Sequence, residues 1–293
     1  MIAVTGITGL LGKHLEEDFN VHNVAFKTIE RSKWDLSDWK TDSELDELFS
    51  ECETMIHMGA ITHNSLSEET TYDMVNANIR SCINLCNWAI KRNIHIIYIS
   101  GATVYEDIYS RSILEDDAKT VNNFGGFYGF TKKIAEDIIL HFKFKGLRAT
   151  ILRPSSIYGI GLTKDKMIMN FIHSAILDGN INISNPNSRV NLVNAFDVAR
   201  GIRLAYLKKA EGIFNITGFV HSIEEIAKTI SSSVDKKDIL INVLNDSNDV
   251  RTRFDLNGNL AKSSFNYEPA ITLKKGIRII LDKLNVEDME TEK

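Results

Sequence analysis

The chain has 293 residues, of which 43% are hydrophobic and 25% charged, and its formal net charge is −5. This composition is typical of a globular protein with a large core and one or two domains. The negative charge and the absence of a basic stripe argue against nucleic acid as a partner. No apolar run reaches the roughly 18 residues that a membrane helix needs, so we expect no membrane partner either.

The start of the chain and its cysteines bear on the cellular compartment in which the protein is expected. Residues 1–5 enter a strand directly, which leaves no room for a signal peptide. Cys82 and Cys86 stand four residues apart on an expected helix, a spacing that could suit a metal, but no histidines cluster with them. We therefore predict buried thiols, no metal site and a cytoplasmic protein.

A glycine turn, Gly6-Ile7-Thr8-Gly9-Leu10-Leu11-Gly12, follows the first expected strand at residues 2–5. Leu11, Leu15 and Phe19 then recur at helical spacing. Glycines let the backbone approach a pyrophosphate, and the N-terminus of the following helix attracts its charge. The G-x-x-G-x-x-G spacing alone would equally suit a tight turn, but its place between strand and helix predicts a dinucleotide site. Its residues would be Gly6, Thr8, Gly9, Leu10, Leu11 and Gly12.

The second expected strand, about 23–29, ends at residues that could choose the cofactor. Glu30 would favour NAD by accepting from the ribose 2′-hydroxyl, whereas Arg31 would favour NADP by pairing with a 2′-phosphate. Either residue could instead be a solvated loop charge. Asp35 and Leu36 could hold the adenine edge, or Asp35 could cap the helix that follows. The choice between NAD and NADP stays open.

Strands and helices alternate through the first half. We expect a charged helix near 42–50, a buried run at 54–58, a long helix within 68–92 and a strand at 94–100. A polar loop at 106–126 precedes a helix from Tyr128 to about 144 and a strand at 148–153. This alternation predicts right-handed crossovers and an α/β fold with a doubly wound parallel sheet.

The second half has a looser pattern. Helices are expected near 166–178, from 196, after a capping box at Ser222–Glu225, and over 273–284. There is no repeat, low-complexity linker or proline-rich hinge. We therefore divide the chain into a dinucleotide-binding domain, 1–160, and a smaller substrate-binding lobe, 161–293, with some of its segments returning to the first body.

Tyr128 and Lys132 stand four residues apart on one expected helix, so their side chains share a face. A free tyrosine has a pKa of about 10 and is a poor base near neutral pH. A neighbouring ammonium would lower that pKa and could also bind a nicotinamide ribose. By itself, a tyrosine four residues before a lysine often arises by chance as a surface pair. Downstream of a nucleotide turn, it predicts proton transfer to or from a substrate hydroxyl.

With these motifs the chain resembles the extended short-chain dehydrogenase/reductase family, the NAD-dependent epimerase/dehydratase group with a Rossmann-like fold. Further matching segments are His57–Ala60, Ser100–Tyr105, Arg153–Gly159 and 191–199. The resemblance implies cofactor contacts from Met58, Gly59, Ala60, Asn78, Ser100, Pro154 and Ser155, in addition to Tyr128 and Lys132. It also implies NAD or NADP as cofactor, a nucleotide-activated sugar as substrate, and a homodimer that uses the tyrosine-bearing helix.

Two departures from the family pattern matter. The family places a Ser or Thr hydroxyl where this chain has Gly101, and Thr103 or Ser100 could replace it; we assign Thr103 as the third catalytic residue. Sugar 4,6-dehydratases of the family carry an Asp-Glu pair where this chain has Ala102-Thr103. Dehydration is therefore not expected, which leaves an epimerase or a reductase, with the modest length slightly favouring a reductase.

The remaining expectations concern the substrate. Two phosphates on a sugar nucleotide call for cations. Candidates are Arg189, Arg251 and Arg253, and we assign Arg189 and Arg253 with Thr62, Thr103 and Ser156 to substrate binding. Two alternatives stay open: a dinucleotide sensor or scaffold that lost its chemistry, which Gly101 would suit, and a reductase of a non-sugar carbonyl compound.

Overall fold

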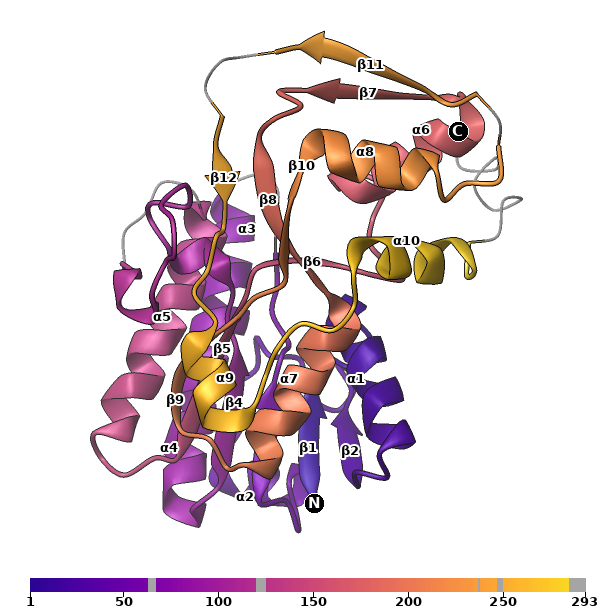
Figure 1. Cartoon of the computed structure of the whole chain (residues 1–293). Helices are drawn as coiled ribbons and strands as arrows, with labels where there is room; N and C mark the ends of the chain where they lie inside the picture. Colours follow the sequence, from indigo (N-terminus) through magenta and orange to yellow (C-terminus); the bar gives the residue numbers. More distant parts are fainter. Residues whose placement is uncertain (63–66, 120–124, 237, 247–249, 285–293) are drawn as a thin grey trace.

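A computed structural model describes residues 1–62, 67–119, 125–236, 238–246 and 250–284. Its centre is a parallel six-stranded sheet in the order β2-β1-β3-β4-β5-β9. The strands are β1 (Ile2–Thr5), β2 (Phe26–Ile29), β3 (Thr54–His57), β4 (His95–Ile99), β5 (Ala149–Pro154) and β9 (Gly212–Ile216). The predicted doubly wound α/β fold is confirmed (Figure 1).

Helices cover both faces of this sheet (Figure 1). One face packs against α1 (Leu10–Val21), α7 (Ala195–Leu207) and α9 (Asn259–Phe265). The other packs against α2 (Asp42–Leu48), α4 (Ser81–Arg92) and α5 (Gly126–Lys143). Because both faces are covered, the central strands β1, β3, β4 and β5 are buried along their whole length, which is why they read as apolar runs in the sequence.

The long helix expected within 68–92 has three parts. It begins as α3 (Glu68–Met74), passes through a π-helical segment, η1 (Val75–Arg80), and continues as α4. A π-helical turn widens the helix and often accompanies a functional residue. Here it carries Asn78.

The chain after β5 builds a lobe above the carboxyl ends of the sheet (Figure 1). Its elements are β6 (Ser156–Tyr158), α6 (Met167–Leu177), β7 (Asn180–Ser184), β8 (Arg189–Asn194), β10 (Phe219–Ser222), α8 (Ile223–Ser231), β11 (Leu240–Asn245), β12 (Thr252–Arg253) and α10 (Leu273–Leu281). The capping box that the sequence predicted is present, with Ser222 accepting from the Glu225 backbone at 3.0 Å. The lobe has its own core, formed by α6, α8, α10 and strands β7 and β8.

The lobe and the sheet are joined by segments that cross between them. β9 returns from the lobe to the edge of the central sheet beside β5, and α7 packs along α1. A buried ion pair links those two helices, with the Arg203 guanidinium 2.6 Å from the Asp18 carboxylate. The pair therefore holds α7 against α1 on one face of the sheet.

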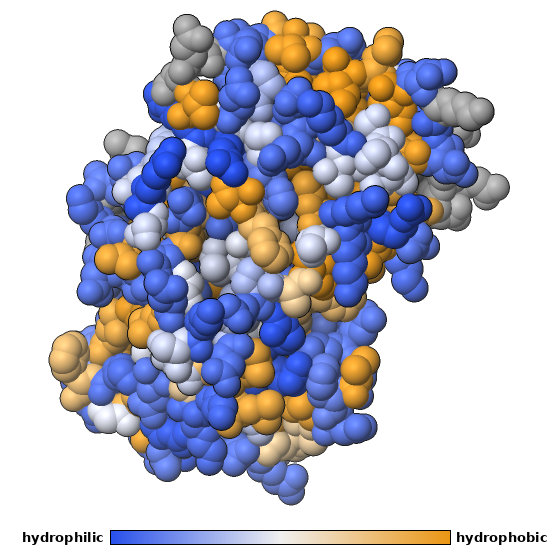
Figure 2. All heavy atoms as spheres, viewed as in Figure 1, coloured by the Kyte–Doolittle hydropathy of each residue, from blue (hydrophilic) through white to orange (hydrophobic). Residues whose placement is uncertain are grey.

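Polar residues cover most of the sheet-containing body on the face in Figure 2, and apolar residues gather over β7 and β11 at the top. The exposed apolar side chains there include Leu240, Val243 and Leu244. Within the described ranges, no helix has the length and apolar character needed to cross a membrane.

Candidate active site

A small cavity of about 190 Å³ lies at the carboxyl ends of β1, β2 and β3. This edge is the switch point of the sheet, because β2 and β3 lie on opposite sides of β1, and open α/β sheets bind nucleotides at such a point. The lining includes eight residues that the sequence assigned to the cofactor: Gly6, Thr8, Glu30, Arg31, Asp35, Leu36, Gly59 and Ala60.

The glycine turn brings β1 against β3 more closely than side chains would permit. Gly6 has φ +77°, and a Cβ on it would stand 2.6 Å from the backbone nitrogen of Gly59. A Cβ on Gly12 would stand 2.2 Å from the Ile7 carbonyl oxygen. Helix α1 starts after Gly9 with no described side chain capping it and no acidic residue in its first turn. Its free N–H groups suit a pyrophosphate.

The charges beside this cavity interact with one another. Arg31 donates from Nε to the Asp35 carboxylate at 2.7 Å, and Asp35 also accepts from the Ser37 backbone at 3.0 Å. These two contacts hold the pKa of Asp35 below its usual value, the backbone contact first. Asp35 therefore does not cap α2, whose cap is Thr41. Glu30 is exposed at the end of β2.

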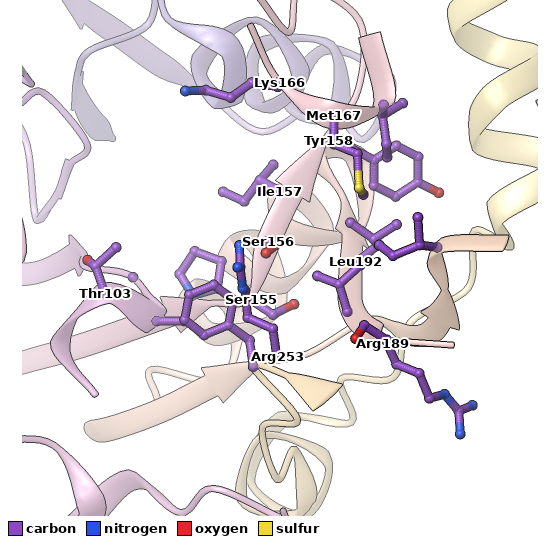
Figure 3. A pocket seen from close by; sticks show the side chains of 18 of the residues that line it. Thr103, Ser155, Ser156, Ile157, Tyr158, Lys166, Met167, Arg189, Leu192 and Arg253 are labelled. Carbon is purple, nitrogen blue, oxygen red and sulfur yellow. The ribbon is translucent and has the colours of Figure 1, made fainter. Parts of the chain in front are cut away.

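A second cavity of about 910 Å³ lies between the carboxyl ends of β4 and β5 and the lobe. Figure 3 shows Ser155, Ser156 and Arg253 together in the middle of this cavity, with Thr103 on one side, Arg189 on the other and Lys166 above. Assigned residues that line it are Ser100, Thr103, Tyr128, Pro154, Ser155, Ser156, Arg189 and Arg253. The cavity is large enough for a drug-sized polar ligand.

Tyr128 and Lys132 lie on α5, and the Lys132 Nζ atom is 5.9 Å from the centre of the Tyr128 ring. Lys132 is buried and donates to the Ile99 carbonyl at 2.8 Å. Burial lowers the pKa of Lys132 to about 8 and raises the pKa of Tyr128 to about 12. The two side chains lie close together, as the sequence predicted, but the predicted lowering of the Tyr128 pKa is wrong, because burial disfavours the charged phenolate.

Two hydroxyls face this region without a partner. Ser100 Oγ and Thr103 Oγ1 are buried and have no hydrogen-bond partner among the described residues. A Cβ on Gly101 would meet Thr103 Oγ1 at 3.7 Å, in ordinary contact. The Thr103 hydroxyl therefore stands beside the space that a side chain at 101 would enter. Unpaired buried hydroxyls beside a cavity are suited to a bound ligand.

Asn78 has a supporting position rather than a place on a cavity wall. Its amide exchanges hydrogen bonds with the Ile61 backbone at 2.8 and 2.9 Å and donates to Thr131 Oγ1 at 3.1 Å. Thr131 in turn donates to the Tyr128 carbonyl at 2.8 Å. Asn78 therefore links the segment after β3 to the turn that bears Tyr128. Eight of the residues that the sequence assigned to the site line neither of the two cavities: Gly9, Leu10, Leu11, Gly12, Met58, Thr62, Asn78 and Lys132.

Ser155 also has a structural contact, since its hydroxyl donates to Asn191 Oδ1 at 2.8 Å.

Sequence reasoning missed several residues of the large cavity. Among them are Tyr109, Met167, Asn185, Ser188 and Lys166, while Arg251 was considered but not assigned. Arg251 lies over the Tyr109 ring at 5.0 Å, a contact between a loop and a distant segment that no local pattern predicts.

The family is decided by comparison of the sequence with family models. The model described as the NAD dependent epimerase/dehydratase family matches residues 2–217, which include both cavities' strand ends and the Tyr128 helix. The chain belongs to the NAD-dependent epimerase/dehydratase family. This epimerase/dehydratase chain has no significant match among curated proteins.

Solved structures of the family share its fold. UDP-N-acetylglucosamine 4-epimerase from Bacillus cereus is 25% identical with a TM-score of 0.80, and the alignment covers 97% of each chain. UDP-glucuronic acid 4-epimerase from Bacillus cereus, in complex with NAD, is 20% identical with a TM-score of 0.76, covering 96% of this chain and 95% of that one. RMD from Pseudomonas aeruginosa, complexed with NADPH, is 19% identical with a TM-score of 0.79, covering 99% of each.

Proposed function

We propose that this protein is an NAD-dependent epimerase of a nucleotide-activated sugar, with Tyr128 as the acid/base. The observation that carries the proposal is the meeting of Tyr128 with Ser100 and Thr103 on the wall of one large cavity, beside a cavity fit for adenosine. The 4-epimerase from Bacillus cereus, at 25% identity over almost the whole chain, supports this reaction over a reduction.

The residues present fit a nicotinamide dinucleotide. The Gly6 turn and the free N-terminus of α1 would hold the pyrophosphate, and Glu30 would receive the adenosine ribose. When bound, the oxidised cofactor supplies a hydride acceptor and a positive charge, and that charge favours the tyrosinate form of Tyr128. Lys132, whose Nζ lies within 6 Å of the Tyr128 ring, would donate to the nicotinamide ribose.

Tyr128 would take the proton of a sugar hydroxyl as the carbon beneath it is oxidised and return it when the carbon is reduced on the other face. Thr103 would hold the reacting oxygen, because its hydroxyl is unpaired and lies next to Gly101. The cavity of about 910 Å³ leaves room for the sugar to turn between these two steps. Arg189, Arg251 and Arg253 on its wall would bind the diphosphate.

The charges at the adenosine cavity favour NAD over NADP. The Arg31 guanidinium is paired with Asp35, and the carboxylate of Glu30 also lines the adenosine cavity, where it would meet the ribose. A carboxylate accepts from a 2′-hydroxyl and repels a 2′-phosphate.

An epimerase and a reductase differ in what they do to the cofactor. An epimerase needs only catalytic NAD, because each hydride removed is returned, whereas a reductase consumes reduced cofactor in proportion to product. We expect UDP-sugar epimers to interconvert with NAD and with no net absorbance change at 340 nm, and NADP to serve less well. Stoichiometric consumption of NADPH with a keto-sugar nucleotide would replace the epimerase by a reductase.

Tyr128→Phe tests the assigned acid/base. It removes one oxygen and keeps the ring that packs in the site, so NADH binding measured by fluorescence should stay within about twofold. Turnover should fall by at least about a hundredfold, as expected when the group that transfers the proton is lost. Unchanged turnover would reject the role of Tyr128. Binding of dinucleotide without turnover of any sugar nucleotide by the unsubstituted protein would instead favour the sensor.

A further inference from the structure

The amine of Lys132 is buried away from water. The side chain is 2% exposed, and its Nζ atom donates to the Ile99 carbonyl at 2.8 Å. A buried ammonium is costly unless nearby groups compensate for the water that it lost. The hydrogen bond to one carbonyl uses one of its three donor hydrogens.

An aromatic ring supplies the second contact. Tyr98, the residue before Ile99 on β4, is 1% exposed and holds its ring face 4.7 Å from the Lys132 Nζ atom. That distance is well inside the roughly 6 Å range in which a cation is attracted to a ring face, and shorter than the 5.9 Å to the Tyr128 ring. Tyr98 is fixed between its register partners His57 on β3 and Ile151 on β5.

We propose that the Tyr98 ring is a positioning group that keeps the Lys132 side chain charged and holds it beside the Tyr128 ring through a cation–π contact. The importance of this for turnover rests on the proposed function. The contact itself does not, since it depends on the geometry of β4 and α5 alone. A ring carries no charge of its own, so it stabilises the ammonium without binding it in an ion pair that would withdraw it from the ribose.

Other titratable groups face the same amine. They are Tyr128 and Glu136 from α5, Cys82 from α4, and His57 from β3. Burial raises the pKa of Tyr128 to about 12 and that of Tyr98 well above its usual value, and burial first, with Lys132 second, lowers the pKa of His57 to about 3. Glu136 is bound by Arg153 at 2.6 Å. The thiol of Cys82 needs a control.

The test measures the protonation of Lys132 directly, in the full chain without substrate. The protein is labelled with lysine carrying carbon-13 at Cε, the Lys132 signal is assigned by its loss in Lys132→Met, and its chemical shift is followed against pH. Tyr98→Leu should lower the titration midpoint of Lys132 by about 0.5 to 1.5 pH units, the equivalent of a buried cation–π contact. Tyr98→Phe, which retains the ring, should leave the midpoint within about 0.3 units of the unsubstituted protein.

The sign of the shift separates this role from simple packing. If Tyr98 only fills space, Tyr98→Leu will leave the midpoint unchanged, or raise it by letting water reach the amine, and either result overturns the proposal. Cys82→Ser removes the neighbouring thiol, and the shift caused by Tyr98→Leu should persist in that background. If the leucine variant does not fold, fluorinated phenylalanines at position 98 replace it, and the midpoint should fall stepwise as fluorine weakens the ring's negative face.

Failure of the Tyr98 proposal can be distinguished from failure of the proposed function. Loss of the epimerase assignment would leave the titration of Lys132 as predicted. An unshifted titration would leave the Tyr128→Phe result intact.

Discussion

At the scale of single residues, the departure at Gly101 is the feature that most affects the chemistry. Gly101 has an extended backbone, φ 178°, that any residue could adopt, and a Cβ there would touch Thr103 Oγ1 at 3.7 Å without a clash. Glycine is therefore not required by the fold at this position. The Thr103 hydroxyl lies within contact distance of the place where a side chain at position 101 would begin, and we propose that it replaces the hydroxyl of the family pattern.

Thr103→Val should test that replacement. Valine keeps the shape of threonine and removes the hydroxyl, so kcat should fall by about 10²- to 10³-fold, the usual effect of losing one donor to a reacting oxygen. Thr103→Ser keeps the hydroxyl and should stay within about tenfold of the unsubstituted enzyme. Adding Gly101→Ser to Thr103→Val should restore part of the rate. Steady-state kinetics decide the matter, and a valine variant with normal kcat would remove Thr103 from the site.

At the scale of elements, α5 is attached to the sheet by a buried ion pair. Arg153 at the end of β5 donates to both oxygens of Glu136 at 2.9 and 2.6 Å, and both residues are almost fully buried. Arg153 also donates to Tyr105 Oη at 3.1 Å. Glu136 lies one turn after Lys132, so this pair fixes the helix that bears Tyr128 and Lys132 against the strand that leads to Ser155.

Glu136→Gln should destabilise the protein strongly. The substitution leaves the Arg153 charge buried without its counterion, and we expect the free energy of unfolding to fall by about 3 kcal/mol or more. Glu106→Gln is a matched control in an exposed pair, because the Glu106 carboxylate lies 2.6 Å from Lys119 and the two side chains are 48% and 67% exposed. It should cost less than about 1 kcal/mol. Urea unfolding measures both, and equal small losses would mean that the buried pair contributes little.

At the scale of the whole molecule, buried histidines make stability depend on pH. Burial lowers the pKa of His57 to about 3 and that of His95 to about 4. In the unfolded chain both take up a proton near pH 6.5. The unfolded state therefore binds more protons than the native state below pH 6.5, and stability falls as the pH falls from there toward 4 and 3. Above pH 7 these two groups have no effect.

Between pH 7 and pH 5 the loss should be about 2 kcal/mol for each histidine. Thermal unfolding across this range measures it. His95→Gln should remove part of the dependence, because one buried imidazole is gone. A melting temperature that does not change between pH 7 and pH 5 would contradict the assignment of both histidines.

Some of this protein follows from the sequence by itself. Apolar runs and helical periodicity predicted five of the six strands of the central sheet, all but β9, and the helices on its faces apart from α9. Burial on both sides demands apolar runs, and burial on one side demands a helical stripe. The glycine turn, Tyr128 and Lys132 were found because close backbone approach and a shared helix face require those residue types at those spacings.

Tertiary structure decided the rest. The pKa of Tyr128 depends on how fully the folded chain buries this side chain, and the hydrogen bonds between Asn78 and the Ile61 backbone depend on where separate segments meet. The large cavity takes Tyr109, Lys166 and Arg251 from segments far apart in the chain. Local patterns record which face of an element is buried, but desolvation and the meeting of distant side chains are set only when β4, β5 and the lobe close around the same space.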